Sequence, residues 1–221
     1  IVVPYPPGGI ADKVARDTAA ELQKKWNQTV VVENRSGAAG NIGFDYVNRQ
    51  PADGYTLLLA PASNLTVQTS LFKNLPYDLD KDFTPVSLLV LTPQVLLVHP
   101  SLNVSNVKEL VDYAKKETAE KGSFQYATAG VGTMGHLLGE YFFSEQGIKQ
   151  QHVGYKGSVP ALQDLVGGQV QVMFADGPSA LPFIKAGKIK ALGVGNPEPS
   201  KFFPGVPTIS ASGLPGYEAY R

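Results

Sequence analysis

The chain has 221 residues, and its 19 Lys and Arg residues are balanced by 19 Asp and Glu residues, so the formal net charge is zero. This length allows a sizeable core in one large domain or two small ones. Nucleic acid is not expected as a partner, because phosphate binding needs a basic face. The sequence has no cysteine, which excludes disulfides, thiolate catalysis and Cys-ligated zinc. No apolar run approaches the roughly 18 residues that would indicate a transmembrane helix.

Strand and helix signals alternate in the first part of the chain. The run "IVV" at 1–3 predicts a strand, and apolar residues with helical spacing predict a helix over 11–26. The apolar runs at 29–33 and 55–60 predict two more strands, with a loop and a second helix between them. This βαβαβ order predicts a parallel sheet with right-handed crossovers.

An irregular stretch at 72–85 separates this part from a second alternating pattern. Two apolar runs, "VSLLVL" (86–91) and "QVLLVHP" (94–100), come first. We then expect helices near 107–114, 134–142, 159–165 and 179–187, and strands at 124–130, 150–155, 169–175 and 189–194. The sequence therefore predicts two α/β units, with a break near His99-Pro100.

Three predicted strands end in loops of glycine or small residues that lead into helices, at 4–12, 60–66 and 127–135. A helix N-terminus carries unpaired backbone N–H groups and a partial positive charge. Glycines before it let the backbone approach a ligand closely, so such turns suit a phosphate or a carboxylate. Ligands of α/β sheets bind at the carboxyl ends of strands, and two such units facing each other would form a cleft.

The third loop contains Gly130, Gly132 and Gly135 in the pattern G-x-G-x-x-G of dinucleotide-binding turns. Such a site also needs an acidic residue about 20 positions later to hold the ribose. Tyr155 and Lys156 stand there, and the preceding strand supplies no acid. A nucleotide-binding enzyme that uses the 130–135 turn is therefore only an alternative to an anion site without nucleotide.

Catalytic and metal-binding patterns are weak. There is no G-x-S-x-G nucleophile motif, and His99, His136 and His152 are scattered. His136 and Glu140 share a helix face at i, i+4, but two ligands without a third favour a surface hydrogen bond over a metal pair. We expect no catalytic residue, no metal and no cofactor.

Most of the chain resembles a known family. The residues that carry the resemblance are "VVPYPPGGIADKVAR" (2–16), "VVVENRSGAAGNIG" (30–43), "ADGYTLLLA" (52–60), "ATAGVGTMGHL" (127–137), "GYKGSVPALQDLVGGQVQVMF" (154–174), "PSALPFIKAGKIKALGV" (178–194) and "GVPTISASGLPGYE" (205–218). Their order and spacing are similar to those of the Bug or TctC-like family, the periplasmic solute-binding proteins of tripartite tricarboxylate transporters.

The resemblance implies an α/β fold of the type II periplasmic-binding-protein kind, a two-lobed Venus flytrap in which each lobe is a mostly parallel sheet flanked by helices. Lobe 1 would comprise residues 1–99 and lobe 2 residues 100–195. Residues after about 196 would complete lobe 1, together with a helix-rich stretch that family members usually carry after "GLPGYE".

The resemblance also implies a function without catalysis. The expected protein is a periplasmic monomer that captures a small carboxylate between its lobes and delivers it to the permease subunits of the transporter. The carboxylate could be a di- or tricarboxylate, an aromatic acid or an amino acid. A ligand-sensing effector module of the same fold is the alternative.

The ligand residues implied by the resemblance come from the three loops and from one strand end. Thr133 has the alternative of being only a helix N-cap, and Asp176 of forming only an Asx turn with Gly177-Pro178. Arg35 is expected in an ion pair or loop contact and not on the ligand, which backbone amides, hydroxyls and water would hold. The implied ligand residues are Tyr5, Gly8, Gly9, Ala62, Ser63, Asn64, Thr128, Ala129, Gly132, Thr133 and Asp176.

Overall fold

The computed structural model describes residues 1–217 and divides the chain into two compact units, residues 1–90 and the residues from 91 onward. The boundary precedes β3 (Gln94–Val98), because β3 pairs with β6 (Val172–Asp176) and β7 (Lys190–Val194) of the second unit. The structure thus differs from the expected break near His99-Pro100, which assigned this strand to lobe 1. Within the described residues, no helix is long and apolar enough to cross a membrane.

Unit 1 contains a small parallel sheet. β1 (Val2–Val3) pairs with β2 (Glu33–Asn34), and Val2 also forms a parallel bridge to Leu58. Of the three expected parallel strands, two are therefore present as strands of two residues each, and the third is reduced to the single bridge at Leu58. β1 ends where Pro4 follows, since proline has no amide hydrogen to continue the ladder.

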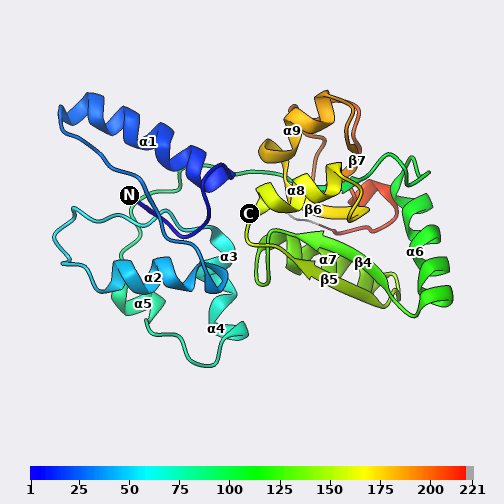
Figure 1. Cartoon of the computed structure of the whole chain (residues 1–221), viewed down its shortest axis with the longest axis horizontal. Coiled ribbons are helices and arrows are strands. Elements are labelled where there is room, and N and C mark those ends of the chain that lie inside the picture. Colours follow the sequence, from blue (N-terminus) through cyan, green and yellow to red (C-terminus); the bar gives the residue numbers. More distant parts are fainter. Residues whose placement is uncertain (218–221) are drawn as a thin grey trace. The chain divides into compact units, whose positions relative to one another are not determined.

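The first two α-helices of unit 1 pack on this sheet, and aromatic rings form a cluster beside it (ribbon in Figure 1). Ala15 and Ala19 form the buried face of the first helix, and Phe44 stacks on Tyr77 with ring centroids 5.3 Å apart. The helices are α1 (Ile10–Trp26), the 3-10 helix η1 (Ala38–Gly40), α2 (Asn41–Asn48), α3 (Ala62–Thr66), α4 (Gln68–Leu71) and α5 (Leu79–Asp82).

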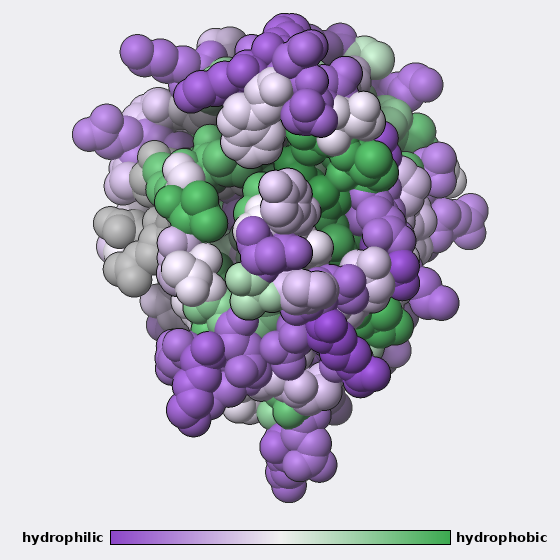
Figure 2. Space-filling view, turned by 90° about the vertical axis from the view of Figure 1, so that its left-hand side faces the viewer, coloured by the Kyte–Doolittle hydropathy of each residue, from purple (hydrophilic) through white to green (hydrophobic). Residues whose placement is uncertain are grey.

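Apolar side chains remain exposed in unit 1. Val31, expected in a strand covered on both faces, is 68% exposed. The apolar run 86–91 forms no strand either, and its large side chains are exposed. Figure 2 shows apolar residues gathered in the middle of one face and ringed by hydrophilic ones.

Unit 2 is built on a five-stranded sheet. Its strand order is β5-β4-β6-β3-β7, with β4 (Phe124–Thr128) and β5 (Gln150–Gly154) added to the strands above. β4 pairs in parallel with β5 and β6, whereas β3 is antiparallel to both of its neighbours. Four strands thus run in one direction and β3 runs in the other, so the sheet is mixed.

Helices cover both faces of the unit 2 sheet (Figure 1). Successive residues of a strand point to opposite faces, and accordingly Leu96 belongs to one core cluster and Leu97 to the other. α6 (Val107–Lys121) and α7 (Met134–Glu145) pack on the first face. α8 (Ser158–Val166) and α9 (Gly177–Lys185) pack on the second face.

The segment after β7 also belongs to unit 2. Ile209 donates its amide to the Val194 carbonyl, and the buried Tyr217 donates its hydroxyl to the Leu138 carbonyl at 3.0 Å. The segment includes the 3-10 helix η2 (Ser210–Ser212). The described residues after 196 therefore pack on unit 2 and do not complete lobe 1 as expected.

Candidate functional site

The 4–9 loop of unit 1 joins β1 to α1 and is tied down by Asp12. One Asp12 oxygen accepts the Gly8 amide at 3.0 Å and Arg16 Nε at 3.0 Å, and the other accepts Asn34 Nδ2 at 2.9 Å. The hydrogen bond from Arg16 is the largest of the contacts that lower the pKa of Asp12 to about 2. Gly8, a predicted ligand residue, thus has its amide hydrogen bonded within the loop, and Gly9 is the N-cap of α1.

Tyr5 and Asn64, two further predicted ligand residues, contact each other directly. The Tyr5 hydroxyl donates to Asn64 Oδ1 at 2.8 Å, and burial raises the pKa of Tyr5 to about 12. Asn64 Nδ2 in turn donates to the Ala39 carbonyl at 2.8 Å, which also accepts Gln68 Nε2 at 3.0 Å. The structure therefore joins the loops at 4–9, 37–40 and 61–66, where the parallel strands of unit 1 end.

The 37–40 loop was not among the predicted ligand segments. Ala38 and Ala39 both adopt left-handed conformations, with φ of 47° and 55°. Each such residue costs roughly 1–2 kcal/mol, so the contacts to the Ala39 carbonyl hold a strained turn. The sequence signal was the pair of alanines bracketed by Gly37 and Gly40. The third expected loop, at 60–66, is mostly the short helix α3, on which Ser63 is buried whereas Ala62 is exposed.

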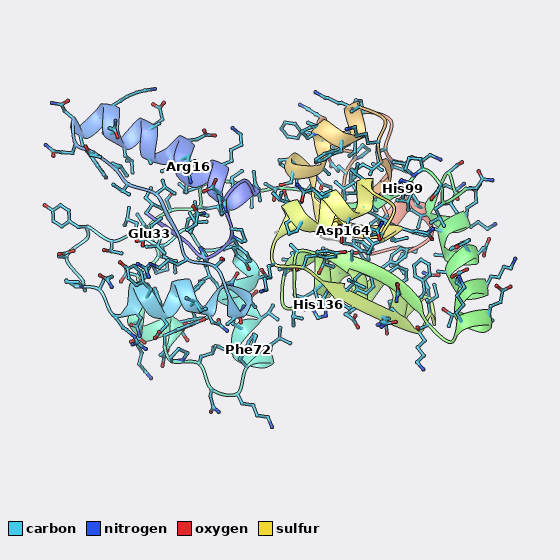
Figure 3. The ribbon with its side chains drawn as sticks, in the orientation of Figure 1. Arg16, Glu33, Phe72, His99, His136 and Asp164 are labelled. Atoms are coloured by element: carbon cyan, nitrogen blue, oxygen red, sulfur yellow. The ribbon has the colours of Figure 1, made fainter. Side chains whose placement is uncertain are left out.

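Arg35 makes the local contacts expected for it. Its guanidinium lies 2.6 Å from Glu33 and stacks over the Tyr46 ring at 3.5 Å from the centroid. Figure 3 labels Glu33 and Arg16 within unit 1. A separate hollow of about 310 Å³ in unit 1 is lined by residues between 69 and 80 and contains none of the predicted ligand residues.

The glycine turn of unit 2 joins β4 to α7, and its glycines have two structural roles. Gly130 and Gly132 have φ of +139° and +76°, which other residues rarely adopt. A Cβ on Gly130 would lie 2.7 Å from the Tyr155 carbonyl oxygen, and one on Gly135 would lie 2.7 Å from that of Phe174. The G-x-G-x-x-G spacing thus serves a left-handed turn and close helix–strand packing.

Hydroxyl groups inside this turn bond to the turn itself. Thr133 caps α7: its hydroxyl donates to the Gly130 carbonyl at 2.7 Å and accepts the His136 amide at 3.4 Å. The buried Thr128 hydroxyl accepts the Gly130 amide at 3.2 Å. Ala129 accepts the Gly157 amide through its carbonyl at 2.9 Å. The N-cap interpretation of Thr133 is therefore confirmed, and contact with a ligand stays a prediction.

Asp176 lies at the end of β6 and connects two helices. Its Oδ1 accepts the Ser179 amide at 3.1 Å, which caps α9, and its Oδ2 accepts the Ser158 hydroxyl at 2.6 Å. The structural role of Asp176 is thus an N-cap with its bond at Ser179, and not the Asx turn with Gly177-Pro178 that was the expected alternative. Ser158 and Gly157 were missed by the sequence reasoning, although the glycine before an apolar helix in "GYKGSVPAL" was an available signal.

The glycine turn, the start of α8 and Asp176 lie at one edge of the unit 2 sheet. α9 begins directly after β6, whereas short loops lead from β4 into α7 and from β5 into α8, and backbone hydrogen bonds join these two loops. Helix N-termini carry partial positive charge, so this edge is suited to an anion.

His136 and Glu140 share one face of α7 as expected, but among the described contacts no hydrogen bond joins the two side chains. His136 Nε2 and Glu140 Oε1 lie 4.0 Å apart, and Tyr126 and Gln150 hydrogen bond to the Glu140 carboxylate. Within residues 1–217, no group of three potential ligands could hold a metal ion. Figure 3 shows His136 and, elsewhere in unit 2, His99.

The sequence of this chain is similar to those of proteins from a known family. The family model named TctC, tripartite tricarboxylate transporter family receptor, matches residues 14–221. BugT of Bordetella pertussis is 39% identical over 220 residues, which cover 99% of this chain and 67% of BugT. The chain thus spans about two thirds of the length of this relative.

Two solved structures from Rhodopseudomonas palustris are also similar. Rpa4515 with adipate is 36% identical at a TM-score of 0.94, with 99% of this chain and 72% of Rpa4515 covered. MatC with bound malate is 33% identical at a TM-score of 0.91, with 99% and 74% covered. Similar structures confirm the expected α/β periplasmic-binding-protein fold. The chain therefore belongs to the TctC family, the receptors of the tripartite tricarboxylate transporter family.

Proposed function

We propose that this protein captures a small carboxylate in the bacterial periplasm and delivers it to the permease of a tripartite tricarboxylate transporter. Its family consists of transporter receptors, which supports a role in binding without chemical conversion. We further propose that this receptor acts as a monomer. The predicted capture of the ligand between two lobes is part of the same proposal.

The observation that carries the proposal is the edge of unit 2 where α7, α8 and α9 begin. A carboxylate there would meet the N-terminal ends of three helices. Hydrogen bonds to an ionised group contribute about 1.5–3 kcal/mol each, so two or three suffice for useful affinity. The Thr128, Thr133 and Ser158 hydroxyls lie at the same edge, where their hydrogen bonds hold the backbone around these helix ends in place.

The arginines support a site made of main-chain and hydroxyl donors. Within residues 1–217, each arginine is ion paired: Arg16 with Asp12, Arg35 with Glu33 and Arg49 with Asp45. Arg221 lies outside the described residues. The predicted absence of an arginine fork is therefore consistent with the described part of the chain.

The relatives indicate which carboxylates to test first. Rpa4515 holds adipate and MatC holds malate, both of them dicarboxylates. We infer that this protein also prefers a dicarboxylate of similar length.

A thermal-shift screen of the full-length protein tests the proposal. The panel contains adipate, malate, glutamate, citrate and benzoate, with NAD for the nucleotide alternative. Ligand at 100 times Kd stabilises the folded state by about 2.7 kcal/mol, which raises the midpoint clearly. Calorimetry then measures Kd for each hit. A response to NAD and to no carboxylate would overturn the proposal.

A further inference from the structure

Two histidine rings lie behind the glycine turn and contact both of its ends. His152 Nε2 on β5 lies 2.6 Å from the hydroxyl of Thr128, the last residue of β4. The Gly132 amide donates to His136 Nδ1 at 3.3 Å. The two ring centroids are 4.2 Å apart. Two of the predicted ligand residues thus contact one histidine pair, whose histidines had appeared unrelated in the sequence.

The pair is neutral near pH 7. Burial lowers the pKa of His136, and burial together with His136 lowers the pKa of His152 to about 4. Rings this close cannot both carry a charge readily, because like charges disfavour each other. A neutral His136 whose Nδ1 accepts the Gly132 amide carries its proton on Nε2, on the side of Glu140.

The groups that face the pair come from three elements. Glu140 on α7 favours the protonated rings, and its carboxylate accepts the Tyr126 hydroxyl at 2.7 Å and Gln150 Nε2 at 2.7 Å. Tyr126 on β4 is neutral, because burial and Glu140 raise the pKa of its hydroxyl far above its usual value. Gln150 and His152 come from β5. One carboxylate and the neighbouring ring therefore govern the charge of each histidine.

We propose that this pair is a proton-linked clamp on the glycine turn, so that capture of an anion at the turn is coupled to the uptake of one proton by the pair. The inference rests on the proposed function. His136 and His152 are positioning residues in it: they act on the ligand through Gly132 and Thr128.

The coupling follows from the hydrogen bond at His136. A proton on Nδ1 turns this atom from an acceptor into a donor, so the Gly132 amide loses its partner and becomes free for an anion. The positive ring also attracts the anion. Both effects favour the anion on the protonated protein, and by linkage the bound anion favours protonation by the same factor.

The clamp is tested first without ligand, by NMR on the full-length protein. The Gly132 amide resonance and the histidine ring resonances are followed from about pH 8 downward. We expect the Gly132 amide to shift with the titration of His136. His136→Asn keeps an acceptor close to the Nδ1 position but does not titrate, so the amide shift should disappear. If the Gly132 amide resonance of the wild type does not shift while the His136 ring titrates, the clamp is overturned.

The linkage is tested with adipate above about pH 6.5, where its carboxylates are ionised. Calorimetry in two buffers of different ionisation enthalpy counts the protons taken up on binding. We expect uptake by the wild type, and an affinity that rises with falling pH by at most about tenfold per unit. His136→Asn should bind adipate with no uptake through this ring. His99→Asn is the matched control, because His99 hydrogen bonds with Ser101 elsewhere in unit 2.

The outcomes separate the inference from the proposed function. Adipate binding without proton uptake, or equal uptake by wild type and His136→Asn, overturns the inference and leaves carboxylate binding intact. Failure of every carboxylate in the panel overturns the proposed function. In that case the Gly132 amide titration in the free protein still decides whether the clamp exists.

Discussion

Replacing Asn64 by alanine tests the junction that joins the loops of unit 1. Asn64 is fully buried, accepts the Tyr5 hydroxyl and donates to the Ala39 carbonyl. The substitution leaves the Tyr5 hydroxyl without this acceptor, which costs about 1–3 kcal/mol. The Ala39 carbonyl keeps the bond from Gln68 and adds little. We expect the free energy of unfolding to fall by about 2–3 kcal/mol.

A double-mutant cycle with Tyr5→Phe isolates the shared hydrogen bond. Tyr5→Phe removes the donor, so Asn64→Ala should then cost about 1 kcal/mol less than in the wild type. Urea unfolding followed by tryptophan fluorescence measures both backgrounds, because Trp26, the only tryptophan of the chain, lies in α1 of unit 1. Thr66→Ala serves as the control, since Thr66 is exposed on the same helix as Asn64. Additive effects of the two substitutions would refute the junction.

Three further substitutions test the loops. The contacts of Asp12 lower its pKa to about 2, so its ionised carboxylate stabilises the folded protein above its ordinary pKa of 3.8, and this stabilisation is lost as pH falls toward 2. Asp12→Asn should remove this pH-dependent part of the free energy of unfolding, which urea unfolding across that range measures. Asp176→Ala removes the α9 cap and the Ser158 contact and should cost about 1–3 kcal/mol by circular dichroism, whereas no loss would contradict the capping role. Gly132→Ala should weaken adipate binding in calorimetry more than Gly147→Ala, the control with a left-handed glycine outside the turn.

Sequence patterns predicted α1 and α2 of unit 1 and the helices and strands of unit 2, but not the short helices α3, α4 and α5, which have four or five residues each and so contain too few turns to show a period. They overestimated the strands of unit 1. The run at 29–33 is β-branched and the run at 55–60 is rich in leucine, yet pairing stops where the two residues of β1 end at Pro4. The length of a strand depends on the neighbouring strand with which it pairs, and the local sequence does not show how long that neighbour is.

The direction of β3 and the position of the unit boundary also depend on tertiary contacts. An apolar strand looks the same whether its neighbours are parallel or antiparallel, so the sequence did not indicate that β3 lies between β6 and β7. In the same way, the glycine spacing predicted a turn at 128–135 but not the histidines behind it. His136 and His152 meet only because α7 packs on β4 and β5.

The internal bonds of the glycine turn bear on how it would select a ligand. Thr133 already bonds Gly130, and Gly157 bonds Ala129, so the turn is ordered before a ligand arrives and little entropy is lost on binding. Only the Gly132 amide must leave a partner, and that neutral bond is worth about 1 kcal/mol. A neutral ligand oxygen would merely replace it. A carboxylate forms a charge-assisted bond about twice as strong and so gains on exchange. His136 thus lets this turn discriminate ionised acids from their neutral amides without any arginine at the turn.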